Sequence, residues 1–236
     1  MKQRVDYSDF RLSQINAPQY AHLKLLLGWI VYFIAYFLTE NLIPEEACHV
    51  IHCRLDDIIP FREEFVLAYC IWYVLTAGSL LYFLLYDVER FKQLQTFIII
   101  TQVVAVILYI VYPSRQELRP EVFPRDNVFT AVIGWIYAFD TPTGICPSLH
   151  VAYSMGIASV WLKDKDVPRW WRAGVLALVI IICLSTLFIK QHSVVDLLVA
   201  IPVSMLAEGI VFRHRYRLTR FLTLQHQKKK TFGKGV

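Results

Sequence analysis

The feature that most constrains this chain is a series of long apolar blocks that contain few or no charged residues. A helix needs about 20 mostly apolar residues to cross roughly 30 Å of hydrocarbon. We therefore predict an all-α, polytopic membrane protein, built as a bundle of six transmembrane helices. The predicted spans are Leu25–Leu38, Phe65–Tyr86, Leu94–Tyr112, Leu149–Leu162, Ala173–Ile189 and Ser193–Phe212. The first and fourth are short, and we expect their ends to extend into flanking polar residues.

Composition favours the same class of protein. Hydrophobic residues make up 56% of the 236 residues, and mean hydropathy is +0.46, whereas soluble domains typically hold about 45–50% apolar residues. A soluble protein with buried helices is the alternative, and six separate apolar blocks argue against it. The segment 128–139 is apolar but too short to span, so we predict a buried or interfacial helix there.

The distribution of lysine and arginine predicts the orientation in the membrane. If the N-terminus is cytoplasmic, the segments 1–24, 87–93, 163–172 and 213–236 lie inside, and they hold 18 of the 24 basic residues. Cytoplasmic loops are enriched in these residues. The bias therefore predicts six crossings with both termini in the cytoplasm.

We predict one membrane domain with polar ends. It consists of a cytoplasmic N-terminal segment (1–22), a six-helix membrane domain (23–212) and a basic cytoplasmic tail (213–236). The tail either contacts anionic lipid headgroups or serves only as a stop-transfer signal. The net charge of +5 thus reflects topology, and we expect no nucleic-acid partner.

A short cysteine- and histidine-containing stretch, Cys48 to Cys53, lies in a predicted outside loop. Thiolate and imidazole suit zinc, but adjacent Cys-His pairs rarely converge on one ion, so we predict no metal site. Cys48 and Cys53 could form a disulfide bond with each other.

The candidate functional residues lie in three loops that are predicted to share the extracytoplasmic side. Ionisable residues at the edge of hydrocarbon are costly, and they are functional candidates by default. The three groups are Arg115, Arg119 and Arg125; Ser148 and His150; and Lys190, His192 and Asp196. Because these distant segments share one membrane face, we predict that they form a single site for phosphate chemistry.

His192 and Asp196 are four residues apart at the start of the last span, so they lie on one face of a helix. The carboxylate can accept a hydrogen bond from one imidazole nitrogen, fix the tautomer and leave the other nitrogen as a nucleophile. A pair that only links two helices is the alternative.

The second loop and the cations supply the other expected roles. His150 could donate a proton to a leaving oxygen, and Ser148 with the helix-opening backbone N–H groups could bind phosphoryl oxygens. Arginine binds phosphate with two parallel hydrogen bonds. The candidate phosphate-binding cations are Arg119, Arg125, Lys190 and Arg115. Each of them alone could be a solvated loop charge; only the combination with the histidines favours a phosphate site.

The motifs Arg119-Pro120, Pro147-Ser148-x-His150 and His192-x-x-x-Asp196 resemble, in this order, the signature of the type 2 phosphatidic acid phosphatase superfamily. That signature reads KxxxxxxRP, then PSGH, then SRxxxxxHxxxD. The resemblance covers roughly residues 112–200 at the level of motifs, and the runs 55–65 and 119–126 also look like segments of bacterial members.

This resemblance implies a six-helix membrane core and a reaction through a phosphohistidine, with no metal and no other cofactor. It implies that His192 is the nucleophile, that Asp196 orients it and that His150 is the acid. By the same resemblance, Arg119 and Ser148 contact the phosphate.

The chain departs from the family pattern at three positions. The lysine of the first motif falls on Tyr112, the arginine of the third motif falls on Thr186, and Leu149 replaces the glycine of PSGH. Two phosphate cations are therefore missing from their usual positions, and Arg115, Arg125 or Lys190 could substitute. The sequences CPSLH and STLFIKQHSVVD look closer to the inositol phosphorylceramide and sphingomyelin synthase-like branch.

Three functions follow as expectations. The first is a multi-pass lipid phosphatase of a bacterial-type plasma membrane that hydrolyses a lipid phosphomonoester or diphosphate on the extracytoplasmic face. The second is a lipid head-group transferase that uses the same residues, and the third is a non-catalytic membrane protein. Phosphatidate, polyprenyl phosphates and phosphosphingolipids are all candidate substrates, and the oligomeric state is open.

Overall fold

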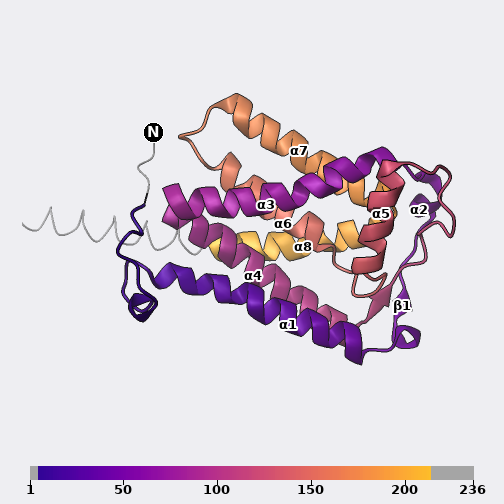
Figure 1. The fold of residues 1–236 in the computed structure, drawn as a ribbon, viewed down its shortest axis with the longest axis horizontal. Coiled ribbons are helices and arrows are strands. Elements are labelled where there is room, and N and C mark those ends of the chain that lie inside the picture. Colours follow the sequence, from indigo (N-terminus) through magenta and orange to yellow (C-terminus); the bar gives the residue numbers. More distant parts are fainter. Residues whose placement is uncertain (1–4, 214–236) are drawn as a thin grey trace, which may run out of the picture.

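The computed structural model describes residues 5–213, which form a bundle of helices (Figure 1). Six helices run along the long axis of the bundle, while α5 lies across one of its ends (Figure 1). The helices are α1 (Leu27–Leu42), α2 (Arg54–Ile58), α3 (Val66–Tyr86), α4 (Val88–Val111), α5 (Val128–Phe139), α6 (Leu149–Leu162), α7 (Arg169–Phe188) and α8 (Val194–Glu208). The predicted basic tail, apart from Arg213, lies outside the described residues.

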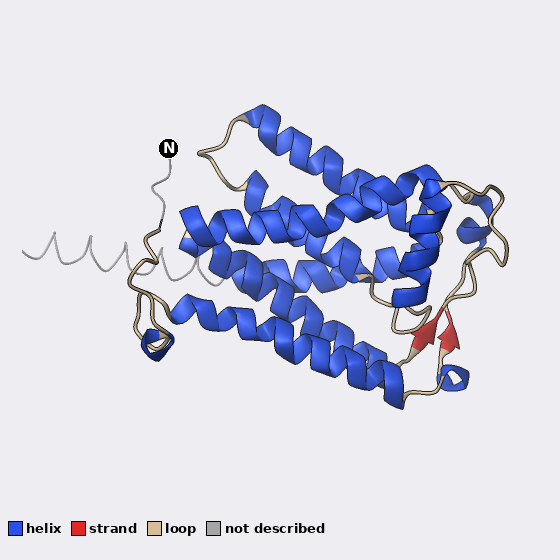
Figure 2. Cartoon of the chain, viewed as in Figure 1, coloured by secondary structure: helices blue, strands red, loops and turns tan. Residues whose placement is uncertain are grey.

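The two short strands lie at the same end of the bundle as α5 (Figure 2). Strand β1 (His49–Val50) pairs in parallel with β2 (Ser114–Arg115), with His49 opposite Ser114. The N-terminal segment lies at the opposite end (Figure 1). Helices α6 and α8 both begin at the α5 end, which brings the two histidine-containing motifs to one side of the molecule.

Five helices of the described part are long and apolar enough to cross a membrane. They are Ala21–Leu42, Glu63–Tyr86, Val88–Val111, Arg169–Phe188 and Val194–Phe212. The expectation that the first span extends beyond 25–38 is confirmed, because 3-10 turns precede α1. The protein is therefore mostly helical and compatible with integral insertion into a membrane.

Helix α6 corrects the expectation for the fourth span, because it does not extend beyond the predicted residues 149–162. The helix has 14 residues and ends at Leu162, where the charged run 163–166 follows. It packs against α3, α4, α7 and α8, and 11 of its residues are buried. Its sides face protein, so the length needed to span lipid does not set its ends.

Helix α1 has the opposite environment. None of its 16 residues is buried, and it packs mainly against α4. Large apolar side chains remain exposed along it: Ile30, Val31, Phe33, Ile34, Phe37, Leu38 and Leu42. A patch of this size is costly in water and marks contact with a partner or a membrane, as expected for a lipid-facing helix.

Helix α5 has the predicted bounds, Val128–Phe139. The side chain of Asn127 accepts hydrogen bonds from the N–H groups of Phe129 and Thr130, which fixes the start of the helix. Only Thr130 and Ile133 are buried in it. The helix is therefore mostly exposed rather than buried, and it covers the end of the bundle where the two motifs meet.

Candidate active site

The two predicted catalytic histidines face one another. Their ring centroids are 5.6 Å apart, and the ring planes meet at 63°. His150 is 9% and His192 8% exposed. Reacting groups in a productive complex approach to about 3–3.5 Å, so both rings can contact one phosphoryl group placed beside them.

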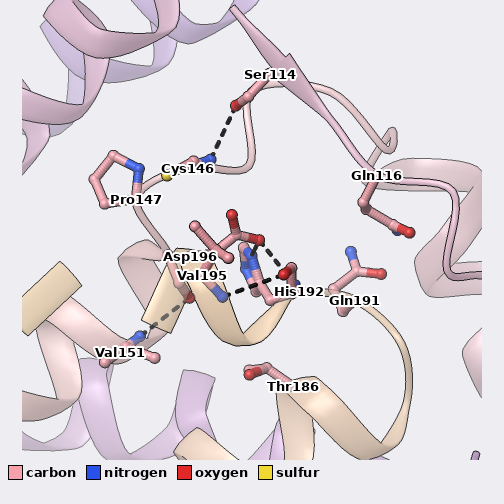
Figure 3. A network of polar contacts seen from close by, with 12 residues as sticks. Ser114, Gln116, Cys146, Pro147, Val151, Thr186, Gln191, His192, Val195 and Asp196 are labelled. Atoms are coloured by element: carbon pink, nitrogen blue, oxygen red, sulfur yellow. Dashed lines mark hydrogen bonds and ion pairs between the residues drawn. The ribbon is translucent and has the colours of Figure 1, made fainter. Parts of the chain in front are cut away.

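The Asp196 carboxylate fixes the His192 ring, as predicted, but the two residues do not share a helix face, because His192 lies in the turn before α8 (Val194–Glu208). Asp196 Oδ2 lies 3.2 Å from His192 Nδ1 and also accepts a hydrogen bond of 2.9 Å from the Ser193 N–H (Figure 3). An ionised carboxylate can only accept. The contact therefore assigns the ring proton to Nδ1 and leaves a lone pair on Nε2.

A backbone hydrogen bond joins the two motifs directly. The Ser148 N–H donates to the Asp196 carbonyl oxygen over 3.2 Å. The Ser148 hydroxyl accepts from the Val151 N–H at the start of α6, and the residue is fully buried. Ser148 thus caps α6 and connects it to α8, and it does not line the cavity next to the histidines.

Aromatic side chains of α3 surround His150. The ring centroids of Trp72 and Tyr69 lie 4.1 and 4.6 Å from the His150 ring, and that of Tyr73 lies at 6.3 Å. These residues were not predicted to belong to the site. Their spacing of three and four residues places them on one helix face, and this spacing is the feature of the sequence that could have indicated a shared role.

Arg119 is the predicted cation that reaches the loop carrying His192. Its guanidinium donates to the carbonyl oxygens of Tyr137 and Asp140 and, over 3.1 Å, to Gln191 Oε1. Gln191 directly precedes His192. Burial lowers the pKa of Arg119, and the Asp140 carboxylate opposes that shift. Arg119 thus places one positive charge beside the residue that precedes His192.

Lys190 points away from the histidines, toward α2. Its ammonium donates to the carbonyl oxygens of Asp56 and Ile59 over 2.7 and 2.5 Å. Burial lowers the pKa of Lys190, while Asp56 and Asp57 oppose the shift. The backbone of Lys190 is left-handed, with φ 56°, which reverses the chain between α7 and α8. The structure thus gives Lys190 a role in shaping the loop.

Arg115 and Arg125 are also not brought together with the histidines. Arg125 pairs with the buried Glu63 over 2.7 Å, and Arg115 pairs with Glu117 over 2.6 Å and with Glu45 over 3.5 Å. None of these acidic partners was predicted to belong to the site. These arginines therefore hold surface segments together.

The positions of the two missing family cations have structural roles. Tyr112 stacks on His49 with a centroid distance of 4.2 Å. Thr186 is buried, and its carbonyl oxygen accepts from the N–H groups of Gln191 and His192. Thr186 thus supports the catalytic loop through its backbone, which a residue of any type can do.

Asp56 is a further residue that was not predicted to belong to the site. Its carboxylate accepts from Ser193 Oγ (2.7 Å) and from the N–H groups of Val194 and Cys53 (both 2.8 Å). Burial raises the pKa of Asp56, but these hydrogen bonds outweigh it and hold the pKa below its usual value. Asp56 thereby fixes the first turn of α8, directly after His192.

The histidines line one end of a cavity of about 480 Å³, within the usual range of ligand sites, about 300–1,000 Å³. Residues of α1 and α3 form two of its walls, and α6 and the loop 140–145 close it. Its rim includes Phe33, Tyr73 and Phe139, which are 58%, 51% and 92% exposed. The cavity therefore reaches the surface between α1 and α3.

The cysteine stretch contributes nothing to this cavity. Cys48 and Cys53 are free thiols. Within residues 5–213, no group of three or more histidine, cysteine, aspartate or glutamate side chains is placed to hold a metal ion.

Comparisons with protein families, with curated proteins and with solved structures found no match for this chain.

Proposed function

We propose that this chain is an integral membrane enzyme of the type 2 phosphatidic acid phosphatase superfamily that hydrolyses a lipid phosphomonoester or diphosphate. The observation that carries the proposal is the pair of imidazoles 5.6 Å apart at one end of a lipid-sized cavity. Asp196 leaves Nε2 of His192 free to attack. The motif resemblance places the same residues in the same roles.

In the proposed first step, His192 Nε2 attacks phosphorus in line with the lipid oxygen. The P–N bond forms, the P–O bond to the lipid breaks, and the leaving oxygen takes a proton from the His150 imidazolium. Asp196 stabilises the positive charge that develops on His192. In the second step, water gives a proton to His150 and attacks phosphorus, so that the P–N bond breaks and phosphate leaves.

Three neighbours support these steps. Trp72 and Tyr69 lie within 5 Å of the His150 ring and hold it in place. Arg119 lies beside the His192 loop. We assign to it the neutralisation of charge on the phosphoryl oxygens.

In the membrane, we propose six crossings, with α6 as a crossing helix that packs against α3, α4, α7 and α8. Both termini are then cytoplasmic, and the histidines, α2 and α5 lie on the extracytoplasmic side of a bacterial-type plasma membrane. The excess of basic residues in the predicted inside segments supports this orientation. The lipid enters sideways, between α1 and α3.

Covalent labelling tests the proposal. Purified protein in detergent is mixed with phosphatidate that carries radioactive phosphate, and both phosphate release and acid-labile labelling of the chain are measured. The wild type is expected to release phosphate and to carry the label, whereas His192→Ala should lose both, with turnover reduced by more than a thousandfold. His52→Ala, which changes an exposed histidine paired with Asp57, is the matched control and should behave as wild type.

A His192→Ala variant that keeps turnover within about tenfold of wild type would exclude His192 as the nucleophile. Loss of activity on chelation, restored by zinc or magnesium, would count against the metal-independent mechanism.

A second candidate function is favoured by a carboxylate in the cavity wall, Asp140. In a head-group transferase the first step is the same, and the phosphoryl group then passes to a lipid hydroxyl, which a carboxylate can bind.

A further inference from the structure

Asp140 is the carboxylate that lies in the cavity wall next to the catalytic loop. Its Oδ2 accepts from Gln191 Nε2 over 2.5 Å and from the Tyr69 hydroxyl over 3.4 Å, and its Oδ1 accepts from the Tyr36 hydroxyl over 3.4 Å. Hydroxyl donors normally approach to about 2.7–2.8 Å. The two tyrosine contacts are therefore weak, and the carboxylate can accept a further hydrogen bond.

The charges around the cavity do not suit an anionic group deep inside it. Of the described residues that line it, none is lysine or arginine. Arg119 lies near Asp140 but outside the lining, and it offsets the charge of the carboxylate. Arg119 repels a further cation at this place, and the Asp140 carboxylate repels a phosphate. An uncharged hydrogen-bond donor is repelled by neither residue.

The imidazole of His150 borders the same cavity as Asp140. Tyr69 connects the two groups, because its hydroxyl contacts Asp140 Oδ2 over 3.4 Å and its ring centroid lies 4.6 Å from that of His150. A ligand hydroxyl that reaches Asp140 therefore lies in the cavity that both histidines line.

The rest of the cavity is suited to hydrocarbon. Its walls carry the aromatic rings of Trp29 and Phe33 from α1 and of Trp72 and Tyr73 from α3. The opening lies between helices whose outer faces are apolar and exposed. A chain that enters here comes from the lipid phase and brings its polar end toward Asp140.

We propose that Asp140 is a specificity-determining residue that binds the hydroxyl group of an uncharged lipid alcohol lying in the α1–α3 cavity. Resting on the proposed function, this lipid is either the alcohol that leaves when the phosphoester is cleaved or an alcohol that accepts the phosphoryl group from His192. The hydroxyl occupies the same place in both cases, because one reaction is the reverse of the other at the P–O bond.

Equilibrium binding to the inactive His192→Ala protein tests the hydroxyl contact without turnover. The two probes are dioctanoylglycerol and its acetyl ester, which lacks the hydroxyl, and binding is followed by the fluorescence of Trp29 and Trp72. A hydrogen bond to a charged group contributes about 1.5–3 kcal/mol, so dioctanoylglycerol should bind about 10- to 100-fold more tightly. Asp140→Ala should abolish this preference, and Asp140→Asn, with a neutral acceptor, should retain part of it.

The ratio of the two affinities separates recognition from damage, because a distorted cavity weakens both probes alike. Asp57→Asn changes an exposed carboxylate at the same end of the bundle and should leave the ratio unchanged. A ratio near one in the His192→Ala protein, or an unchanged ratio in Asp140→Ala, would overturn the assignment of Asp140.

The active protein then distinguishes the two sources of the alcohol. Labelled dioctanoylglycerol added with unlabelled phosphatidate should become labelled phosphatidate if it is an acceptor, and should only inhibit phosphate release if it is the leaving alcohol. If dioctanoylglycerol neither becomes labelled phosphatidate nor inhibits phosphate release, the proposal is contradicted. Absence of turnover and of phosphohistidine, with hydroxyl-selective binding intact, would reject the proposed reaction while leaving the binding site in place.

Discussion

Helices α6 and α1 line the same cavity but are held in very different ways. Helix α6 is surrounded by four other helices, and its first turn is joined to α8 through Ser148 and Asp196. Helix α1 has no buried residue and packs mainly against α4. The cavity therefore has one wall fixed within the bundle and one wall at the lipid-facing surface.

In the proposed function, this difference separates two tasks: chemistry at the phosphoryl group and entry of the lipid from the bilayer. The reacting groups must be held within a fraction of an ångström, which a close-packed interior provides. Entry of a long hydrocarbon chain requires a wall that borders lipid. His150 is on the first kind of wall, and Phe33 is on the second.

The largest expected difference between the two walls is in turnover. His150→Ala should lower kcat by about 10²–10⁴-fold, because general acid catalysis contributes that much, with little change in KM. Phe33→Ala should raise KM severalfold and leave kcat within about twofold, because only apolar contact with the chain is lost. Steady-state kinetics with phosphatidate in mixed micelles measures both. Equal losses of kcat in the two variants would break the comparison.

The next difference is in packing, and two glycines test it. A Cβ on Gly156 of α6 would lie 2.6 Å from the Phe97 ring, whereas a Cβ on Gly28 of α1 would lie 2.7 Å from the flexible Ile99 side chain. Gly156→Ala should cost about 1–3 kcal/mol through overpacking. Gly28→Ala should cost less, because α1 lies at the surface and can shift away from Ile99, and because alanine favours the helix by about 1 kcal/mol. Thermal unfolding in detergent compares the two, and a more harmful Gly28→Ala would reverse the interpretation.

The smallest expected effect concerns Asp56, which holds the first turn of α8, and this effect depends on pH. Because the folded state lowers the pKa of Asp56, its ionised form adds stability above the unfolded value of about 3.9. That contribution disappears as the pH falls below this value through the folded pKa. Asp56→Asn should therefore lower stability by about 1 kcal/mol from pH 5 to 8.

The difference between Asp56→Asn and wild type should shrink below about pH 4. Thermal unfolding at several pH values provides the measurement. A difference that stays constant as the pH falls below the unfolded pKa of about 3.9 would show that the charge of Asp56 is not what holds α8.

Features with a local cause could be predicted from the sequence. The apolar blocks predicted the long helices, and the turn chemistry around Asn127 delimits α5 at the predicted residues. The His192–Asp196 contact was predicted, but not its geometry, because His192 lies in the turn before α8 and only Asp196 is on the helix. The termination of α6 at Leu162 was missed, because burial on all sides, which the sequence does not display, removes the length requirement.

The partners of the charged residues could not be predicted, because they come from distant segments. Arg125 pairs with Glu63, 62 residues away, and the ammonium of Lys190 reaches Asp56, 134 residues away. An arginine near a histidine motif is equally compatible with phosphate binding and with such a pairing. The same reason hid the contribution of Tyr69 and Trp72, whose contact with His150 joins two helices far apart in sequence.

The left-handed backbone at Lys190 restricts where residues can be inserted into this chain during evolution. The connection between α7 and α8 has only five residues, 189–193, and all five backbone N–H groups already have acceptors in α7 or in Asp196. Adding one residue would displace His192 by up to about 3.5 Å, beyond the reach of Asp196 and away from His150. We therefore expect insertions to be tolerated in the long connection 112–127, whereas the position of His192 fixes the length of the 189–193 turn.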